Sequence, residues 1–224
     1  NFSLKTAMAA AAGDRSLLCP KASRAEAAWV GGCQVIGADL DASRRELASK
    51  LGLTHALDPS QPGMIEEVLR RTEGIGADGV IVTAASSSND IMSQSFQMCR
   101  RKGRVVLVGA VGLDLNREDF YKKEIDFLIS TSYGPGRYDP SYEEQGIDYP
   151  IGYVRWTENR NMGEYLRLLS QGAIQVEPMI QETFSVDQAN AAYASLKKEE
   201  ARPLVVLLSY PQDNSVKPTR LVQI

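Results

Sequence analysis

Apolar residues along this chain gather into short uninterrupted runs, and these alternate with longer segments in which apolar residues recur every three or four positions. The short runs predict strands over residues 34–38, 55–57, 78–84, 104–111 and 125–131. Two of them, DGVIVTA and RVVLVGAV, are rich in β-branched residues throughout. Such runs are typical of strands that are buried on both faces in the middle of a parallel sheet.

Helical spacing of apolar residues occupies the intervals between these strands. It predicts helices over residues 42–51, 63–72 and 89–101, the first followed by Gly52 and the last closed by Gly103. Strands that alternate with helices form a parallel sheet with helices on both faces. We therefore predict an α/β fold with a doubly wound parallel sheet, Rossmann-like, in a three-layer sandwich.

The alternation stops after residue 131. Residues 132–160 are rich in Tyr, Gly, Pro and charged residues without either period, which predicts a long functional loop. Helical spacing resumes at Met162 and ends at Gly172. The capping-box spacing of Ser185-Val186-Asp187-Gln188 opens another helix, and a last strand is predicted over residues 203–208.

These patterns divide the chain into four segments. We expect an atypical N-terminal segment (1–30), a Rossmann-like domain (31–131), a loop insertion with C-terminal return helices and strand (132–208), and a polar tail (209–224). Because no strand followed by a glycine-rich turn is recognisable in the first segment, the N-terminal βα unit is expected to be incomplete. The centre of the sheet would then be imperfectly filled.

Composition narrows the class of protein. The 224 residues are 43% apolar and 24% charged with a formal net charge of −3, which is ordinary for a soluble globular protein and leaves no electrostatic footprint for nucleic acid. Basic pairs such as Arg44-Arg45 are interpreted as solvated helix faces. No segment is long and apolar enough for a membrane helix. Cys19, Cys33 and Cys99 have no CxxC spacing, so we predict a reducing, cytoplasmic compartment.

One predicted strand ends in a carboxylate, in the sequence GCQVIGAD. At the end of the second strand of a dinucleotide-binding βαβ unit, a residue such as Asp39 accepts hydrogen bonds from the adenosine ribose hydroxyls. Its charge repels a 2′-phosphate, so Asp39 favours NAD over NADP. Arg44 is close enough to reach the ribose edge or the adenine. The alternative is that Asp39 or Asp41 simply caps the helix that follows.

The stretch from Gly32 to Leu208 resembles the cofactor-binding half of the zinc-type alcohol dehydrogenase family, the medium-chain dehydrogenases. The matching pieces stand in the order and spacing of that family: GCQVIGADLDASRRELASKLGLTHALD, GADGVIVTAAS, CRRKGRVVLVGAVG, FYKKEIDFLISTSYG and LLSQGAIQVEPMIQETFSVDQANAAYASL. The segment YGPGRYDP…DYPIGYVRWTENRNM more narrowly resembles the dehydrogenase half of two-module oxidoreductases.

This resemblance implies hydride transfer between NAD and a small-molecule alcohol or sugar-like substrate, with zinc in the intact family. It assigns the adenosine ribose to Asp39 and Arg44, the adenine and ribose side of the cleft to Thr83 and Ala84, and the nicotinamide side to Gly109 and Val111. These are carboxyl-end positions, where doubly wound sheets bind ligands. A tight turn after the strand is the alternative role for Gly109 and Gly112.

Two parts of the family pattern are missing. From Asp14 to Val30 the chain has no glycine, so the GxGxxG turn that brings backbone amides to the pyrophosphate is absent. Our hypothesis is a frameshift or a misassigned start. The zinc ligands of the family precede this stretch, and the single histidine, His55, is expected to be structural. We therefore assign no catalytic residue and no metal ligand.

The Tyr-rich segment 132–160 has two interpretations. Its rings, donors and acceptors suit the binding of polyols or sugars, and the same composition is typical of a subunit interface; the residues concerned are Arg137, Tyr138, Asp139, Arg155 and Trp156. The resemblance favours the interface and, with it, a homodimer.

Two functions from different classes stay open. The chain is either the cofactor-binding portion of an alcohol or polyol dehydrogenase, or a catalytically inactive truncated remnant or oligomerisation module. Asp39 supports the first. The missing glycines and metal ligands favour the second.

Overall fold

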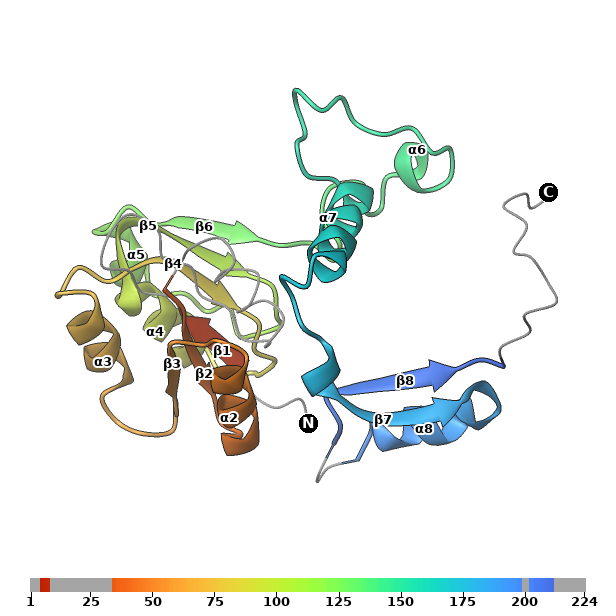
Figure 1. The fold of residues 1–224 in the computed structure, drawn as a ribbon. Coiled ribbons are helices and arrows are strands. Elements are labelled where there is room, and N and C mark those ends of the chain that lie inside the picture. The colour runs from red at the N-terminus through yellow and green to blue at the C-terminus, as the bar shows by residue number, and fades with distance from the viewer. Residues whose placement is uncertain (1–4, 9–33, 199–201, 212–224) are drawn as a thin grey trace. The chain divides into compact units, whose positions relative to one another are not determined.

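The structure is a computed structural model that describes residues 5–8, 34–198 and 202–211 (Figure 1). The chain divides into two compact units, Asn1–Val176 and Glu177–Ile224. Each unit has its own sheet.

The first unit is built on a six-stranded sheet with the order β3-β2-β1-β4-β5-β6. Its strands are β1 (Lys5–Met8), β2 (Ile36–Asp39), β3 (His55–Leu57), β4 (Ala77–Val82), β5 (Cys99–Leu107) and β6 (Asp126–Ile129). β2 and β3 are parallel, and so are β4, β5 and β6. This is the strand order of a doubly wound dinucleotide-binding sheet, and it confirms the predicted fold class.

The central strand runs against its neighbours. β1 is antiparallel to β2, with Lys5 opposite Asp39 and Met8 opposite Ile36, and it is antiparallel to β4 as well. The centre of the sheet is therefore occupied, contrary to the expectation of an imperfectly filled position. Except for β1, the predicted atypical segment 1–30 lies outside the described residues, as do Cys19 and Cys33.

Helices lie on both faces of this sheet, as expected for a three-layer arrangement. On one face, Ala48 of α2 (Ala42–Lys50) packs against Val35 and Leu53. On the other face, α3 (Met64–Arg71), α4 (Asp90–Met98) and α5 (Arg117–Tyr121) cover the main core. The two faces follow from strand geometry, because Val35 and Ile36 are consecutive and must point in opposite directions. The main core comprises Ile36, Val68, Val80, Val82, Met92, Phe96, Val105 and their neighbours.

The helix predicted over residues 89–101 is shorter than expected. α4 ends at Met98, and Cys99 already pairs with Ala77 as the first residue of β5, so Gly103 lies inside the strand. The ammonium of Lys123 caps the C-terminus of this helix. It donates to the carbonyl oxygens of Phe96, Gln97 and Cys99 at 3.1, 2.6 and 2.8 Å. Those carbonyls have no partner within the helix, so a cation from a distant segment fixes its C-terminus.

The segment after β6 is irregular, as predicted, apart from the single turn α6 (Pro140–Glu143). α7 (Glu158–Ser170) begins four positions before Met162 and ends before Gly172. Its predicted apolar face exists but none of its residues is buried.

In the second unit, β7 (Ile180–Ser185) and β8 (Val205–Ser209) pair in parallel and are connected through α8 (Ala189–Ser195). The capping box predicted at residues 185–188 does not form, because Ser185 makes no side-chain cap bond and residues 186–188 form a 3₁₀ turn instead. β7 was not predicted, since its sequence IQETFS holds only two large apolar residues. Such a two-stranded unit has a very small core of its own.

Candidate functional site

The predicted site residues lie at the carboxyl ends of three strands. Asp39 is the last residue of β2 and Arg44 is in α2; Thr83 and Ala84 follow β4, and Gly109 and Val111 follow β5. β2 and β4 flank β1, so Asp39 and Thr83 lie about two strand spacings apart, roughly 10 Å. The topology thus brings the six residues to one edge of the sheet.

The two aspartates at the start of α2 have different roles. Asp41 is the helix N-cap: its Oδ1 accepts from the backbone N of Ser43 at 2.9 Å and of Arg44 at 3.4 Å, and from Ser43 Oγ at 2.7 Å. The hydrogen bond from the Ser43 hydroxyl is the main reason why the pKa of Asp41 is lowered. Asp39 does not cap the helix, and its Oδ1 accepts from the backbone N of Asp41 at 2.9 Å. Of the two aspartates that could have capped α2, only Asp41 does so.

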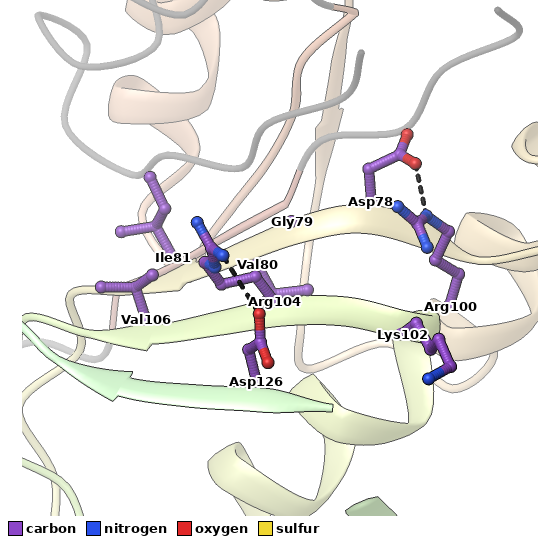
Figure 2. A pocket seen from close by; sticks show the side chains of 9 residues that line it. All are labelled: Asp78, Gly79, Val80, Ile81, Arg100, Lys102, Arg104, Val106 and Asp126. Carbon is purple, nitrogen blue, oxygen red and sulfur yellow. Dashed lines mark hydrogen bonds and ion pairs between the residues drawn. The ribbon is translucent and has the colours of Figure 1, made fainter. Parts of the chain in front are cut away.

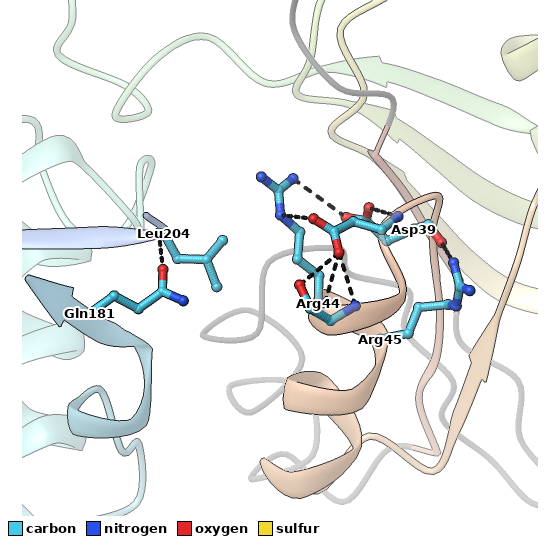
Figure 3. Close-up of polar contacts among 7 residues, drawn as sticks. Asp39, Arg44, Arg45, Gln181 and Leu204 are labelled. Atoms are coloured by element: carbon cyan, nitrogen blue, oxygen red, sulfur yellow. Dashed lines mark hydrogen bonds and ion pairs between the residues drawn. The ribbon is translucent and has the colours of Figure 1, made fainter. Parts of the chain in front are cut away.

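The guanidinium of Arg44 lies beside the carboxylate of Asp39 (Figure 3). It is also close to the carboxylate of Asp41. Its Nη1 is 4.0 Å from Oδ2 of Asp39, and its Nε is 3.4 Å from Oδ2 of Asp41. The side chains of Arg44 and Asp39 are each 13% exposed. Nη1 of Arg44 is buried and makes no hydrogen bond, which is costly for a charged donor. A ligand oxygen at this point would satisfy that donor, so the pair fits the ribose end of a dinucleotide.

Sequence reasoning missed Arg45, the neighbour of Arg44. Its Nη1 donates to the carbonyl oxygen of Asp39 at 2.5 Å, and its Nη2 is 3.1 Å from Oδ2 of Asp58, just after β3. The interpretation of Arg44-Arg45 as a solvated pair is therefore wrong, because both side chains are mostly covered. The available signal was the pair of aspartates at the ends of neighbouring strands, which provides partners for both arginines.

The carboxyl ends of β4 and β5 are in direct backbone contact. Gly109 N donates to the carbonyl oxygen of Val82 at 2.9 Å, and Ala110 N donates to that of Ala84 at 2.9 Å. A Cβ at Gly109 would lie 1.9 Å from the carbonyl oxygen of Ala84. Close strand packing thus requires glycine at this position, whether or not a ligand binds. Gly112 packs in turn against Asn89, just before α4.

The other half of a dinucleotide site is not provided by the described residues. In doubly wound folds the phosphate loop follows the first strand at the ligand-binding edge. Here β1 is reversed, so Met8, its last residue, lies opposite Ile36 at the start of β2 and away from Asp39. The fit to a dinucleotide is therefore limited to its adenosine end.

The part of the chain that the structure describes contains no group of three His, Cys, Asp or Glu side chains able to hold a metal ion. Zinc accordingly does not fit these residues. His55 is part of β3, and burial is the main cause of its lowered pKa. Cys99 is buried and free, and burial raises its pKa to about 11.

A pocket of about 310 Å³ lies along β4, β5 and β6 (Figure 2). It is lined partly by charged side chains, but each of its cations is paired: Arg100 Nε with Asp78 at 2.5 Å, Arg104 with Asp126 at 3.0 Å, and Lys102 with Glu124 at 3.3 Å. A further anion would have to displace these carboxylates. The pocket is thus a weaker candidate than the Asp39 edge.

The Tyr-rich segment is held together by polar contacts of its own. Arg160 donates to the carbonyl oxygens of Val154 and Tyr149 at 2.5 and 2.7 Å and pairs with Asp148 at 2.7 Å. Tyr142 and Tyr149 stack with ring centroids 5.6 Å apart. Several other rings remain exposed, including Tyr133, Tyr138, Tyr153 and Trp156.

In the described residues, no helix is long and apolar enough to cross a membrane.

Comparison with known proteins agrees with this architecture. The family model described as zinc-binding dehydrogenase matches residues 25–145. A sorbitol dehydrogenase from Halalkalibacterium halodurans is 24% identical over 175 residues, which cover 76% of this chain and 43% of that protein. An NAD-dependent alcohol dehydrogenase from Sulfurisphaera tokodaii is 27% identical over 173 residues, covering 77% of this chain and 42% of that protein.

Among solved structures, 2R,3R-butanediol dehydrogenase from Bacillus subtilis is similar with a TM-score of 0.62 and 18% identity, over 82% of this chain and 46% of that one. At this identity the likeness concerns the fold alone. The chain spans less than half of the length of each of these relatives.

Proposed function

The chain belongs to the zinc-binding dehydrogenase family, and from this we propose that it is the cofactor-binding portion of an NAD-dependent alcohol or polyol dehydrogenase. Its own part in the reaction is to hold the adenosine end of the dinucleotide at the carboxyl edge of β2. When bound, NAD supplies the hydride acceptor. The substrate we infer is a small alcohol or polyol, in line with the sorbitol and alcohol dehydrogenases among its relatives.

The observation that carries this proposal is the division of work between Asp39 and Asp41. Asp41 caps α2, whereas the carboxylate of Asp39 lies at the end of a parallel strand beside the mostly buried guanidinium of Arg44. That combination supplies an acceptor and a donor to vicinal hydroxyls. A 2′-phosphate would meet the negative charge of Asp39, so we infer a preference for NAD over NADP.

The second candidate function is a catalytically inactive remnant or an oligomerisation module. It is favoured by the reversed β1, which removes the usual phosphate turn from the binding edge, and by the lack of a three-ligand metal group in the described residues. Exposed rings on the Tyr-rich segment and on α7 favour assembly as the role of such a module, and we propose a homodimer in the cytoplasm.

Titration of the full 224-residue chain with NADH, followed by nucleotide fluorescence, separates the two candidates. The proposal expects a dissociation constant below about 1 mM, with displacement by ADP-ribose, because the adenosine end carries the contacts. Binding of about 1 mM or weaker would contradict it and favour the remnant. Light scattering on the same sample measures the mass and tests the homodimer.

A further inference from the structure

We propose that Arg45 is a positioning residue for the adenosine site: it ties the backbone of Asp39 to Asp58 and so fixes the direction of the Asp39 carboxylate. This inference rests on the proposed function, because it gives Arg45 a role in nucleotide selection. Arg44 would act on the ligand directly. Arg45 would act only through Asp39.

The guanidinium of Arg45 joins three elements. From α2 it reaches the end of β2, where Nη1 donates to the carbonyl oxygen of Asp39 at 2.5 Å, and the residue after β3, where Nη2 is 3.1 Å from Oδ2 of Asp58. Figure 3 shows Arg45 and Arg44 on different sides of Asp39. The side chains of Arg45 and Asp58 are 20% and 26% exposed, so solvent screens the pair only in part.

Asp58 is itself held in place. Its Oδ1 accepts from the backbone N of Ser60 at 2.9 Å and from Ser60 Oγ at 2.6 Å, which leaves Oδ2 directed at Arg45. These bonds from Ser60, followed by the charge of Arg45, lower the pKa of Asp58. The carboxylate is therefore ionised at neutral pH and forms a fixed anchor for the guanidinium.

Together with one local bond, this anchor restrains both the side chain and the carbonyl of Asp39. The backbone N of Asp41 donates to Oδ1 of Asp39 at 2.9 Å, which orients the side chain, while Arg45 holds the carbonyl of the same residue. Loss of Arg45 removes a charged donor from the carbonyl of Asp39 and so loosens the backbone that follows it. Because Oδ1 of Asp39 accepts from the backbone N of Asp41, a shift of that backbone would carry the carboxylate with it. Binding groups must be held to within about 0.5 Å of their productive position, so a small rotation matters.

A positioning role differs from a merely structural one in its effect on two nucleotides. General destabilisation weakens NADH and NADPH alike. Misdirection of Asp39 weakens NADH, which depends on its hydrogen bonds to the ribose, but costs NADPH little because the same carboxylate repels the 2′-phosphate. The ratio of the two dissociation constants is therefore the informative quantity.

The test is fluorescence titration of the full chain and its variants with NADH and with NADPH. For Arg45→Met we expect NADH binding to weaken about tenfold and NADPH binding less than about twofold. Arg45→Lys, which keeps the charge but cannot bridge both partners, and Asp58→Asn should shift the ratio by about threefold. Arg70→Met is the matched control, because Arg70 pairs with Glu67 on the exposed side of α3.

Each outcome decides the matter. A ratio that stays within about twofold of the wild type in all three variants, whether both affinities fall or neither does, overturns the positioning role but not the proposed function. If the wild-type chain binds neither nucleotide, the proposed function fails and this inference fails with it. If Arg45→Met does not fold, as judged by circular dichroism, Arg45→Lys and Asp58→Asn decide by the same ratio.

Discussion

Nη1 of Arg44 and Oδ2 of Asp39 lie 4.0 Å apart, near enough for charge attraction but too far for a hydrogen bond. Both side chains are mostly buried, so the attraction is only partly screened by water. The arrangement leaves a charged donor without a hydrogen bond at the edge where ligands bind in this fold.

Replacement of the ribose-facing acid should change nucleotide selection. Asp39→Asn keeps the size of the side chain and removes its charge, so we expect NADH binding to weaken about tenfold and NADPH binding to improve relative to it. Fluorescence titration with both nucleotides measures the change. Glu46→Gln, on the exposed side of α2, is the control. An unchanged preference would show that Asp39 does not read the ribose.

Removal of the helix cap should lower stability without such selectivity. Asp41→Ala deletes the acceptor for the backbone N of Ser43 and Arg44, and we expect a loss of about 1 kcal/mol in the free energy of unfolding. Asp41→Asn, which keeps an acceptor oxygen, should recover most of it. Urea denaturation followed by circular dichroism measures both. Equal stabilities for the two variants would argue against the capping role.

The space around two glycines, one at the contact between β4 and β5 and one in α7, predicts opposite effects of alanine substitution. Gly109→Ala places a Cβ against the carbonyl oxygen of Ala84 and should cost about 3 kcal/mol, because backbone cannot move away as a side chain would. Gly163→Ala, within α7 and with no atom nearby, should stabilise by about 0.5–1 kcal/mol. Thermal melts compare the two. A neutral Gly109→Ala would mean that this edge of the sheet can open.

Acid should destabilise the first unit through Glu67 on α3. The hydrogen bond from Arg70, with that from Arg71, lowers the pKa of Glu67 to about 2. A carboxyl with a lowered pKa stabilises the folded state above its ordinary pKa of 4.5, and this contribution is lost as the pH falls from there toward about 2. Denaturant midpoints between pH 5 and 2 should therefore fall less steeply in Glu67→Gln.

The control for that experiment is Glu66→Gln, one position away on the same helix, which should follow the wild-type curve. Parallel acid dependence of Glu67→Gln and wild type would show that the pair with Arg70 has no thermodynamic weight. Ion pairs on exposed helix surfaces are often of little value, so this outcome is a real alternative.

The sequence pattern predicts the bounds of an element correctly where local signals and tertiary packing agree. β3 has the predicted bounds of 55–57, and α2 differs from its prediction only by one residue, because apolar spacing, the cap and the following Gly52 coincide there. The placement of Asp39 at the end of a parallel strand follows from the same run of apolar residues. Which of the two aspartates caps α2 could not be predicted, because the side chains of Asp39 and Asp41 are equally able to accept from a helix N-terminus.

Other features depend on distant residues that no local pattern reveals. The end of α4 is fixed by Lys123, which follows it by some twenty-five positions, so the glycine at 103 was a misleading stop signal. Arg45 looked like a surface charge because its partner, Asp58, lies across a loop and a strand. The direction of β1 is set by pairing with β2 and β4, and four residues alone do not specify a direction.

The reversed direction of β1 also limits where phosphate contacts could be built on this sheet. Inserting a glycine-rich turn after Met8 would place it on the far rim of the sheet, where no nucleotide phosphate could reach both it and Asp39. A phosphate site beside Asp39 would need a central strand that runs in the opposite direction, so that its last residue lies next to Asp39 and a helix N-terminus follows it. A glycine-rich turn alone would therefore not create such a site.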